Sequence, residues 1–138
     1  MIGIIEVYGS MLLRALGQTL LLTLLSLLFA MIIGMIFGLM NVGHNRVLNL
    51  IGTIYVDAVR GVPLIVLAYF IYFGVPAGMQ GLGFASFRLN ALQAGTAALS
   101  MNCGAYMAEI IRAGIESVDR GQMEAARSLG LSYSSSMA

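Results

Sequence analysis

Long apolar runs, separated by short polar stretches, dominate the chain. The first run, Leu20–Met40, has 21 residues without a charged side chain, enough for about 30 Å of helix. A second run occupies residues 61–79, and a third, less apolar run occupies residues 89–109. We expect each run to span a membrane, the third inside a bundle where its polar side chains face other helices. The pattern therefore predicts an all-α integral membrane protein with three transmembrane helices.

Polar and helix-breaking residues mark the connections between these spans. Residues 41–46 are rich in Asn and Gly and predict a loop. Pro63 lies in the first turn of the second predicted span, where its missing N–H is tolerated. Pro76 and the glycines that follow it predict the connection to the third span. Residues 7–18, which precede the first span, are expected to lie at the membrane interface.

The composition excludes several classes of protein. Hydrophobic residues make up 59% of the 138 residues and charged residues only 9%, whereas soluble domains carry about 25% charged residues. A net charge of +1 provides no basic stripe for nucleic acid. The single Cys103 and the single His44 lie far apart, so we expect neither a metal site nor a catalytic thiol. No phosphate-binding GxxxxGK[ST] motif is present, so we expect nucleotide to bind to a partner and not to this chain. Because a plausible catalytic group is lacking, we also expect no enzyme activity and no cofactor.

Arginines beside the spans predict the orientation, because cytoplasmic loops carry an excess of them. One side holds the loop after the first span and the segment after the third, with five arginines: Arg46, Arg60, Arg112, Arg120 and Arg127. The opposite side holds Arg14 and Arg88. We therefore expect the C-terminal segment, residues 112–138, to be cytoplasmic and the N-terminus to be outside.

The cytoplasmic segment carries the signals of a short, capped helix. Asp119 and Gln122 have the spacing of an N-terminal capping box. Gly130 is placed to end the helix in a left-handed conformation, and Ser132 to cap a second helix. On pattern alone, this segment predicts either a helix that lies on the membrane or one that another protein approaches closely at the small side chains of Ala125 and Ala126.

Three blocks of this sequence resemble a known family. EAARSLG, Glu124–Gly130, matches the EAA-x-x-x-G loop of the permease subunits of binding-protein-dependent ABC importers. The surrounding residues 105–132 and the block RGVPLIVLAYFIYFGVP, Arg60–Pro76, are similar to the polar amino acid branch of that family. The resemblance covers most of the chain, and the combination of blocks is more specific than EAA alone.

The resemblance implies a function and a set of partners. In that family the EAA loop forms a coupling helix that docks on a cytoplasmic ABC ATPase dimer, which binds the ATP and drives alternating access. The residues that would dock are Gly121, Glu124, Ala125, Ala126 and Gly130. Further implied partners are a second permease subunit, identical or paralogous, an extracytoplasmic solute-binding protein, and a polar amino acid or similar small polar solute as substrate. The implied location is the bacterial cytoplasmic (inner) membrane.

The resemblance also implies that the chain is partial. The family's loop continues for nine residues after the glycine and then reads Ile, any residue, Leu, Pro. Counted from Gly130, that Ile falls at position 140, beyond Ala138. The family's common core has five helices, and we expect this chain to hold three of them.

Polar residues form a stripe on the third span. Gly95, Asn102, Tyr106 and Glu109 fall within an arc of about 60° at roughly 100° per residue. Intramembrane polar groups are candidates for function, so Asn102, Tyr106 and Glu109 are candidates for the substrate path. Helix–helix hydrogen bonding explains Asn102 and Tyr106 equally well.

Two acid–arginine pairs with i, i+3 spacing offer a structural alternative. Glu109 precedes Arg112 and Asp57 precedes Arg60 at a distance that permits ion pairing on a helix. The Glu109–Arg112 pair is more readily interpreted as a structural element that orients the loop.

A protein of another class remains as an alternative. A structural membrane subunit of a larger respiratory or secretion complex would explain the spans and a GxxxG motif at Gly34 and Gly38, which predicts close helix contact. It would not explain EAARSLG with its flanking blocks on the arginine-rich side. A membrane-embedded enzyme would lack a catalytic group.

Overall fold

The computed structural model describes residues 2–132, with side chains from Tyr8 onward apart from those of residues 120 and 123. Helices make up nearly all of this part of the chain, and it contains no strand. In chain order the elements are α1 (Ile2–Val42), α2 (Arg46–Gly61), α3 (Leu64–Tyr69), the π-helical turn η1 (Phe70–Gly74), α4 (Val75–Gly81), α5 (Ala91–Glu116) and α6 (Arg120–Ser128).

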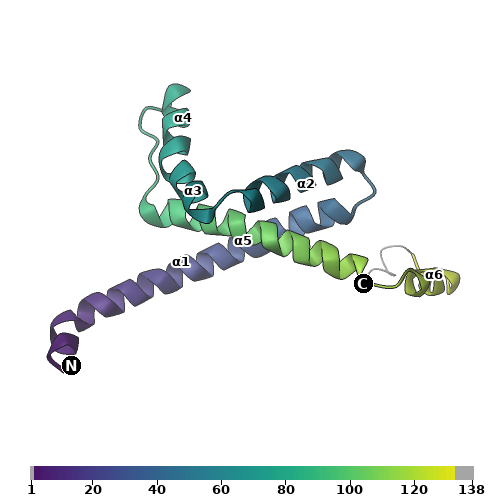
Figure 1. Ribbon diagram of the computed structural model, residues 1–138, viewed down its shortest axis with the longest axis horizontal. Helices are drawn as coiled ribbons and strands as arrows, with labels where there is room; N and C mark the ends of the chain where they lie inside the picture. Colours follow the sequence, from purple (N-terminus) through teal and green to yellow (C-terminus); the bar gives the residue numbers. More distant parts are fainter. Residues whose placement is uncertain (1, 133–138) are drawn as a thin grey trace.

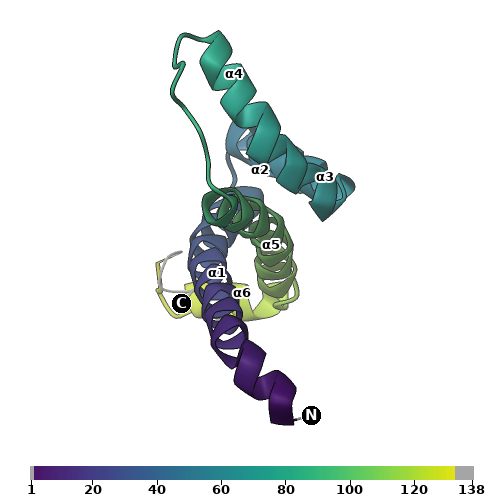
Figure 2. The ribbon, with the colours of Figure 1, turned by 90° about the vertical axis from the view of Figure 1, so that its left-hand side faces the viewer.

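Two long helices form the axis of the molecule. α1 and α5 cross each other in Figure 1 and lie side by side in Figure 2, and they share the most extensive contact between any two elements. α2 runs back along the same pair, whereas the helix that contains α3 and α4 rises away from it (Figure 1). α6 lies beyond the end of α5, and the N-terminal half of α1 extends past the other helices.

The first predicted span is part of a much longer helix. α1 has 41 residues, which corresponds to about 60 Å, twice the thickness of a bilayer's hydrocarbon core. Residues 7–18, which we expected to form a separate lead-in at the membrane interface, continue the same helix. The isolated Gly9 and Gly17 do not interrupt it, since a single glycine weakens a helix without breaking it.

Small residues allow α1 and α5 to approach closely. A Cβ added at Gly34 would lie 2.5 Å from the Cβ of Met107, and one at Gly38 would lie 3.0 Å from the Cβ of Ile111. From the other side, a Cβ at Gly104 would lie 2.7 Å from Cγ2 of Ile33. The GxxxG motif therefore does mark a close helix contact, within the chain itself.

The second span is shifted and irregular. Pro63 is the N-cap of the helix rather than a residue of its first turn. Pro76 was predicted to lie in a connection, but it is buried near the start of α4. η1 explains how: the Val75 N–H donates to the Phe70 carbonyl, an i to i−5 bond that widens the helix just before the proline. The helical segment thus runs from Leu64 to Gly81.

The sequence analysis did not predict helix α2. Its start was detectable, since the Asn45 side chain accepts hydrogen bonds from the N–H groups of Val47 (3.0 Å) and Leu48 (3.4 Å). Its buried residues, Gly52, Val56 and Val59, recur at helical spacing. The charged Arg46, Asp57 and Arg60 concealed the pattern.

The third predicted span lies within α5, which continues to Glu116. Asn90 and Gln93 form a complete capping box at its start, with Gln93 N–H donating to Asn90 Oδ1 at 2.8 Å and Asn90 N–H donating to Gln93 Oε1 at 3.0 Å. Among the described helices, two are long and apolar enough to cross a membrane: residues 8–42 and 64–81. Membrane spanning by α5 therefore stays a prediction.

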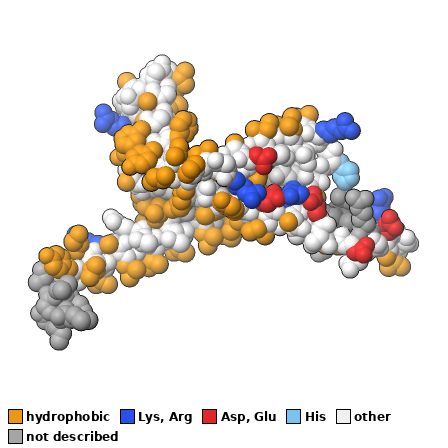
Figure 3. All heavy atoms as spheres, in the orientation of Figure 1, with side chains coloured by type: hydrophobic (Ala, Val, Ile, Leu, Met, Phe, Trp, Pro, Cys, Tyr) orange, Lys and Arg blue, Asp and Glu red, His pale blue; other side chains and the backbone are white. Residues whose placement is uncertain are grey.

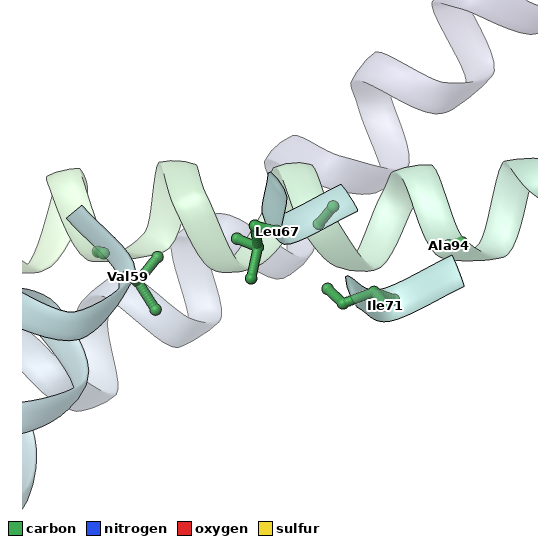
Figure 4. Packing of buried hydrophobic residues seen from close by; sticks show 6 residues of the cluster. Val59, Leu67, Ile71 and Ala94 are labelled. Atoms are coloured by element: carbon green, nitrogen blue, oxygen red, sulfur yellow. The ribbon is translucent and has the colours of Figure 1, made fainter. Parts of the chain in front are cut away.

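A small apolar core joins α5 to the second helical segment. Val59, Leu67 and Ile71 point at the alanine-rich face of α5, which includes Ala94 (Figure 4). Because these alanines are small, the broken helix lies close to α5. This contact places the end of α2 beside the last turns of α5, where the charged residues gather.

Candidate functional site

The predicted docking segment folds as α6. Asp119 is its N-cap, as predicted, and its carboxylate accepts a hydrogen bond from the Gly121 N–H at 2.8 Å. The predicted capping box is not completed: the Gln122 N–H donates to the Asp119 backbone carbonyl at 3.0 Å instead of the side chain. α6 is therefore capped by Asp119 alone.

Gly130 ends α6 in the left-handed conformation that the sequence predicted. Its φ is +84°, and its N–H donates to the Arg127 carbonyl at 3.0 Å. The Leu131 N–H donates to the Ala126 carbonyl at 3.3 Å. Together these two bonds form a Schellman motif, which satisfies carbonyls that the helix leaves open. The second helix expected after Ser132 lies outside the described residues.

α6 offers an accessible surface of small side chains. Glu124 and Ala125 are exposed, and Ala126 is half-buried. Three residues, Ser117–Asp119, join α6 to the end of α5. Such a short connection ties any movement of α6 to the last turns of α5.

A second feature is a polar cavity between α2 and α5. Its volume is about 330 Å³, and α1 contributes Asn41 to its wall. Figure 3 shows acidic and basic side chains gathered there within a largely hydrophobic surface. The charged and hydroxyl side chains that line it are Thr53, Asp57 and Arg60 from α2 and Glu109, Arg112 and Glu116 from α5.

An ion-pair network occupies the α5 side of this cavity. Arg112 donates from Nε to Glu109 Oε2 at 3.2 Å and from Nη2 to Glu109 Oε1 at 2.5 Å, which forms the predicted Glu109–Arg112 pair. Its Nη1 donates to Glu116 Oε2 at 2.5 Å. The hydrogen bonds to Glu109 raise the pKa of the Arg112 guanidinium above its ordinary value, so this group stays charged.

The predicted Asp57–Arg60 ion pair is wrong. Among the described side chains, Arg60 pairs across the helices with Glu109, Nη1 to Oε2 at 3.9 Å, and Asp57 takes part in no ion pair. The Arg60 Cζ also lies 5.2 Å from the centre of the Tyr106 ring, a cation–π distance. Spacing along one helix could not show that α5 would offer Arg60 a competing carboxylate and ring.

Two of the three predicted substrate-path residues lie beside the cavity, and the third does not. Tyr106 and Glu109 both contact Arg60 beside the cavity. Asn102, one turn earlier on α5, is half-buried and does not line it. Sequence reasoning missed Thr53 and Glu116. Thr53 lies four residues before Asp57, and Glu116 lies four residues after Arg112. This helical spacing could have indicated that each shares a helix face with its charged neighbour.

Comparisons with known proteins agree with this architecture. Residues 30–137 match the family model described as the binding-protein-dependent transport system inner membrane component. The chain belongs to this family. The match covers most of the chain, and it includes both α6 and the cavity.

Individual members of the family are similar over large parts of this chain. The probable glutamine ABC transporter permease protein GlnM of Bacillus subtilis is 44% identical over 99 residues, which cover 72% of this chain and 43% of that protein. The arginine transport system permease protein ArtQ of the same bacterium is 44% identical over 87 residues, 63% of this chain and 37% of that protein. The chain thus spans less than half the length of these curated relatives.

A solved structure supports the fold of this chain directly. The structure described as an amino acid ABC transporter with histidines superposes with a TM-score of 0.81 and 37% identity, over 96% of this chain and 59% of that one. The predicted resemblance to an amino acid ABC importer permease and the all-α membrane fold are confirmed. The family is one of inner membrane transport components.

Proposed function

We propose that this chain is a permease subunit of an ATP-driven importer of polar amino acids. The observation that carries the proposal is α6: a capped helix with exposed small side chains, held at the end of α5 by three residues. The match to the family of inner membrane transport components supports it. The relatives named for glutamine and arginine transport make an amino acid the substrate class of choice.

In this proposal α6 docks on a cytoplasmic ATPase, which binds and hydrolyses the ATP. Glu124, Ala125 and Ala126 form the contact, with Gly121 and Gly130 setting the two ends of the helix. When the ATPase closes, α6 moves and carries the end of α5 with it. A second permease subunit and an extracytoplasmic binding protein complete the importer. The N-terminus lies outside and α6 in the cytoplasm, as the arginine distribution predicts.

The proposal is tested by exchanging one exposed alanine of α6. The full permease is co-expressed with its ATPase, purified in detergent and reconstituted with its binding protein. Ala125→Asp places a charge on the exposed face of α6, where it disturbs no internal contact of the helix. We expect ATPase co-purification and ATP-dependent uptake of labelled glutamine and arginine to be lost together.

Ala85→Asp is the matched control. Ala85 is equally exposed but lies in the connection between α4 and α5, away from α6. The control variant should retain both the ATPase and uptake. An Ala125→Asp variant that keeps both would show that α6 is not the docking element. A parent complex that holds its ATPase but imports neither amino acid would overturn the substrate class.

A further inference from the structure

Two opposite charges on α2 face the polar cavity without bonding to each other. Asp57 and Arg60 both line the cavity, and their spacing puts them on the same side of the helix. Within the described part of the chain, the Asp57 carboxylate accepts no hydrogen bond and the Arg60 guanidinium donates none. The cavity therefore offers, among the described residues, a carboxylate that accepts no hydrogen bond and a guanidinium that donates none.

α5 explains why Arg60 stays away from Asp57. The Tyr106 ring attracts the guanidinium through its face, 5.2 Å from the ring centre, and this contact uses none of the N–H donors. Glu109 attracts it at 3.9 Å, but both carboxylate oxygens of Glu109 already accept hydrogen bonds from Arg112. Arg60 is thus held in place while its fork of donors remains available, the geometry that suits a carboxylate.

We propose that this cavity binds the zwitterionic head group of an amino acid. Arg60 donates hydrogen bonds to the α-carboxylate, and Asp57 accepts them from the α-ammonium group. Tyr106 is a positioning residue that holds Arg60. The inference rests on the proposed function, and it deepens it by assigning a head-group site. A volume of about 330 Å³ is within the range of small-molecule pockets.

The arrangement predicts what the site recognises. Every α-amino acid carries the same two head-group charges, so a site built on Asp57 and Arg60 accepts amino acids as a class. It discriminates against analogues that lack either charge, because one charged side chain would then remain unpaired. Selection among amino acid side chains has to come from other residues or from the binding protein.

The test combines variants with ligands that lack one charge each. The reconstituted permease–ATPase complex is titrated with glutamine, with glutaramate, which lacks the ammonium group, and with 4-aminobutanamide, which lacks the carboxylate. Arginine, 5-guanidinopentanoate and agmatine form a second series. Asp57→Asn should weaken binding of the amino acids roughly tenfold to a hundredfold and leave the analogues without ammonium unchanged. Arg60→Gln should weaken the amino acids similarly and leave the analogues without carboxylate unchanged.

A matched variant serves as the control. Arg46→Gln removes an arginine from the other end of α2, outside the cavity. It should bind amino acids as the parent does, and co-purified ATPase confirms that each variant is assembled. Parent-like amino acid affinity in Asp57→Asn and Arg60→Gln would overturn the site, as would an equal loss for all ligands of a series.

The two proposals fail in different ways. An importer that transports glutamine or arginine but is insensitive to both α2 substitutions keeps its proposed function and loses this head-group site. An assembled parent complex that neither binds nor imports any amino acid of the two series overturns both. An analogue too weak to titrate in the parent supports the site, since the missing charge is then essential to binding.

Discussion

α5 packs against α1 on one side and against α2, α3 and η1 on the other, and the two contacts differ in chemistry. Towards α1 it presents Gly104 and Ala108, which are buried so closely that side chains of α1 lie against its backbone. On the other side it presents an alanine-rich face first and then, over its last turns, an ion-pair network. The contact with α1 depends on the close fit of small residues, whereas the contact on the other side ends in ion pairs.

The difference bears on which parts of the molecule can move. Close packing of small residues has one good arrangement, because interiors are dense and tolerate little displacement. Ion pairs at half-exposed positions contribute little to stability and can exchange partners at low cost. We therefore expect α1 and α5 to move as one body, while the end of α2 adjusts its position against α5.

The largest effect should come from filling the α1–α5 contact. In Gly104→Val the new Cβ meets Ile33 at 2.7 Å (Cγ2) and 2.9 Å (Cβ), and the Ile33 Cβ cannot rotate away. Overpacking of this kind costs roughly 3 kcal/mol, so the thermal midpoint of the purified complex should fall sharply. Gly114→Val on the same helix is the control, since nothing lies within 4 Å of a Cβ there. Equal thermal midpoints for Gly104→Val and Gly114→Val would refute the distinction between the close α1–α5 contact and the other side of α5.

A glycine outside the helix contacts tests whether space or backbone conformation decides such effects. Gly130 has open space around it but a φ of +84°. Gly130→Val should therefore cost about 1–2 kcal/mol through the backbone alone and weaken retention of the ATPase. Gly130→Asn is the comparison, because Asn adopts this conformation more readily. Pull-down of the ATPase should rank the parent first, Asn next and Val last; a Val variant that performs like Asn would argue against the Schellman motif.

The sequence analysis predicted the conformation of Gly130 correctly and the ion-pair partner of Arg60 wrongly, and both results have the same physical reason. The signals of α6, Asp119 before the helix and Gly130 after it, act within a few residues and are written in order along the chain. The partner of Arg60 is 49 positions away on α5, and nothing near Arg60 indicates it. Local caps and apolar runs were thus predictable, whereas contacts between helices were not.

The second span shows the same limit. Pro63 marks the start of the span, as its N-cap, but Pro76 was predicted to end it, an inference from local sterics. The π turn before Pro76 and the contact of Leu67 and Ile71 with α5 instead accompany a helix that continues to Gly81. The GxxxG motif was the exception: it predicted a close contact correctly because small residues have little other use on a helix face.

A smaller effect should come from the polar link between α2 and α5. Tyr55 donates its hydroxyl to the Met101 carbonyl at 2.8 Å, and its ring stacks on Phe37 at 4.0 Å. Tyr55→Phe removes the hydrogen bond and keeps the ring, so it should cost about 1 kcal/mol in thermal unfolding of the complex. Tyr8→Phe, at an exposed position, should cost nothing. A loss as large as that of Gly104→Val would mean that α2 is as fixed as α1.

The smallest effect should come from the outer ion pair of the network. Glu116 accepts a hydrogen bond from Arg112, but its side chain is 52% exposed, so water and salt screen the pair. Glu116→Gln should therefore cost at most about 0.5 kcal/mol at low salt, and the difference from the parent should vanish at about 1 M salt, where charges are screened within about 3 Å. In Glu116→Gln, Arg112 keeps both hydrogen bonds to Glu109. Glu109→Gln should cost more stability, because it removes the shared partner of Arg60 and Arg112. A salt-independent loss in Glu116→Gln would show that another subunit shields the end of α5, and the two faces of this helix would then be equally rigid in the assembled transporter.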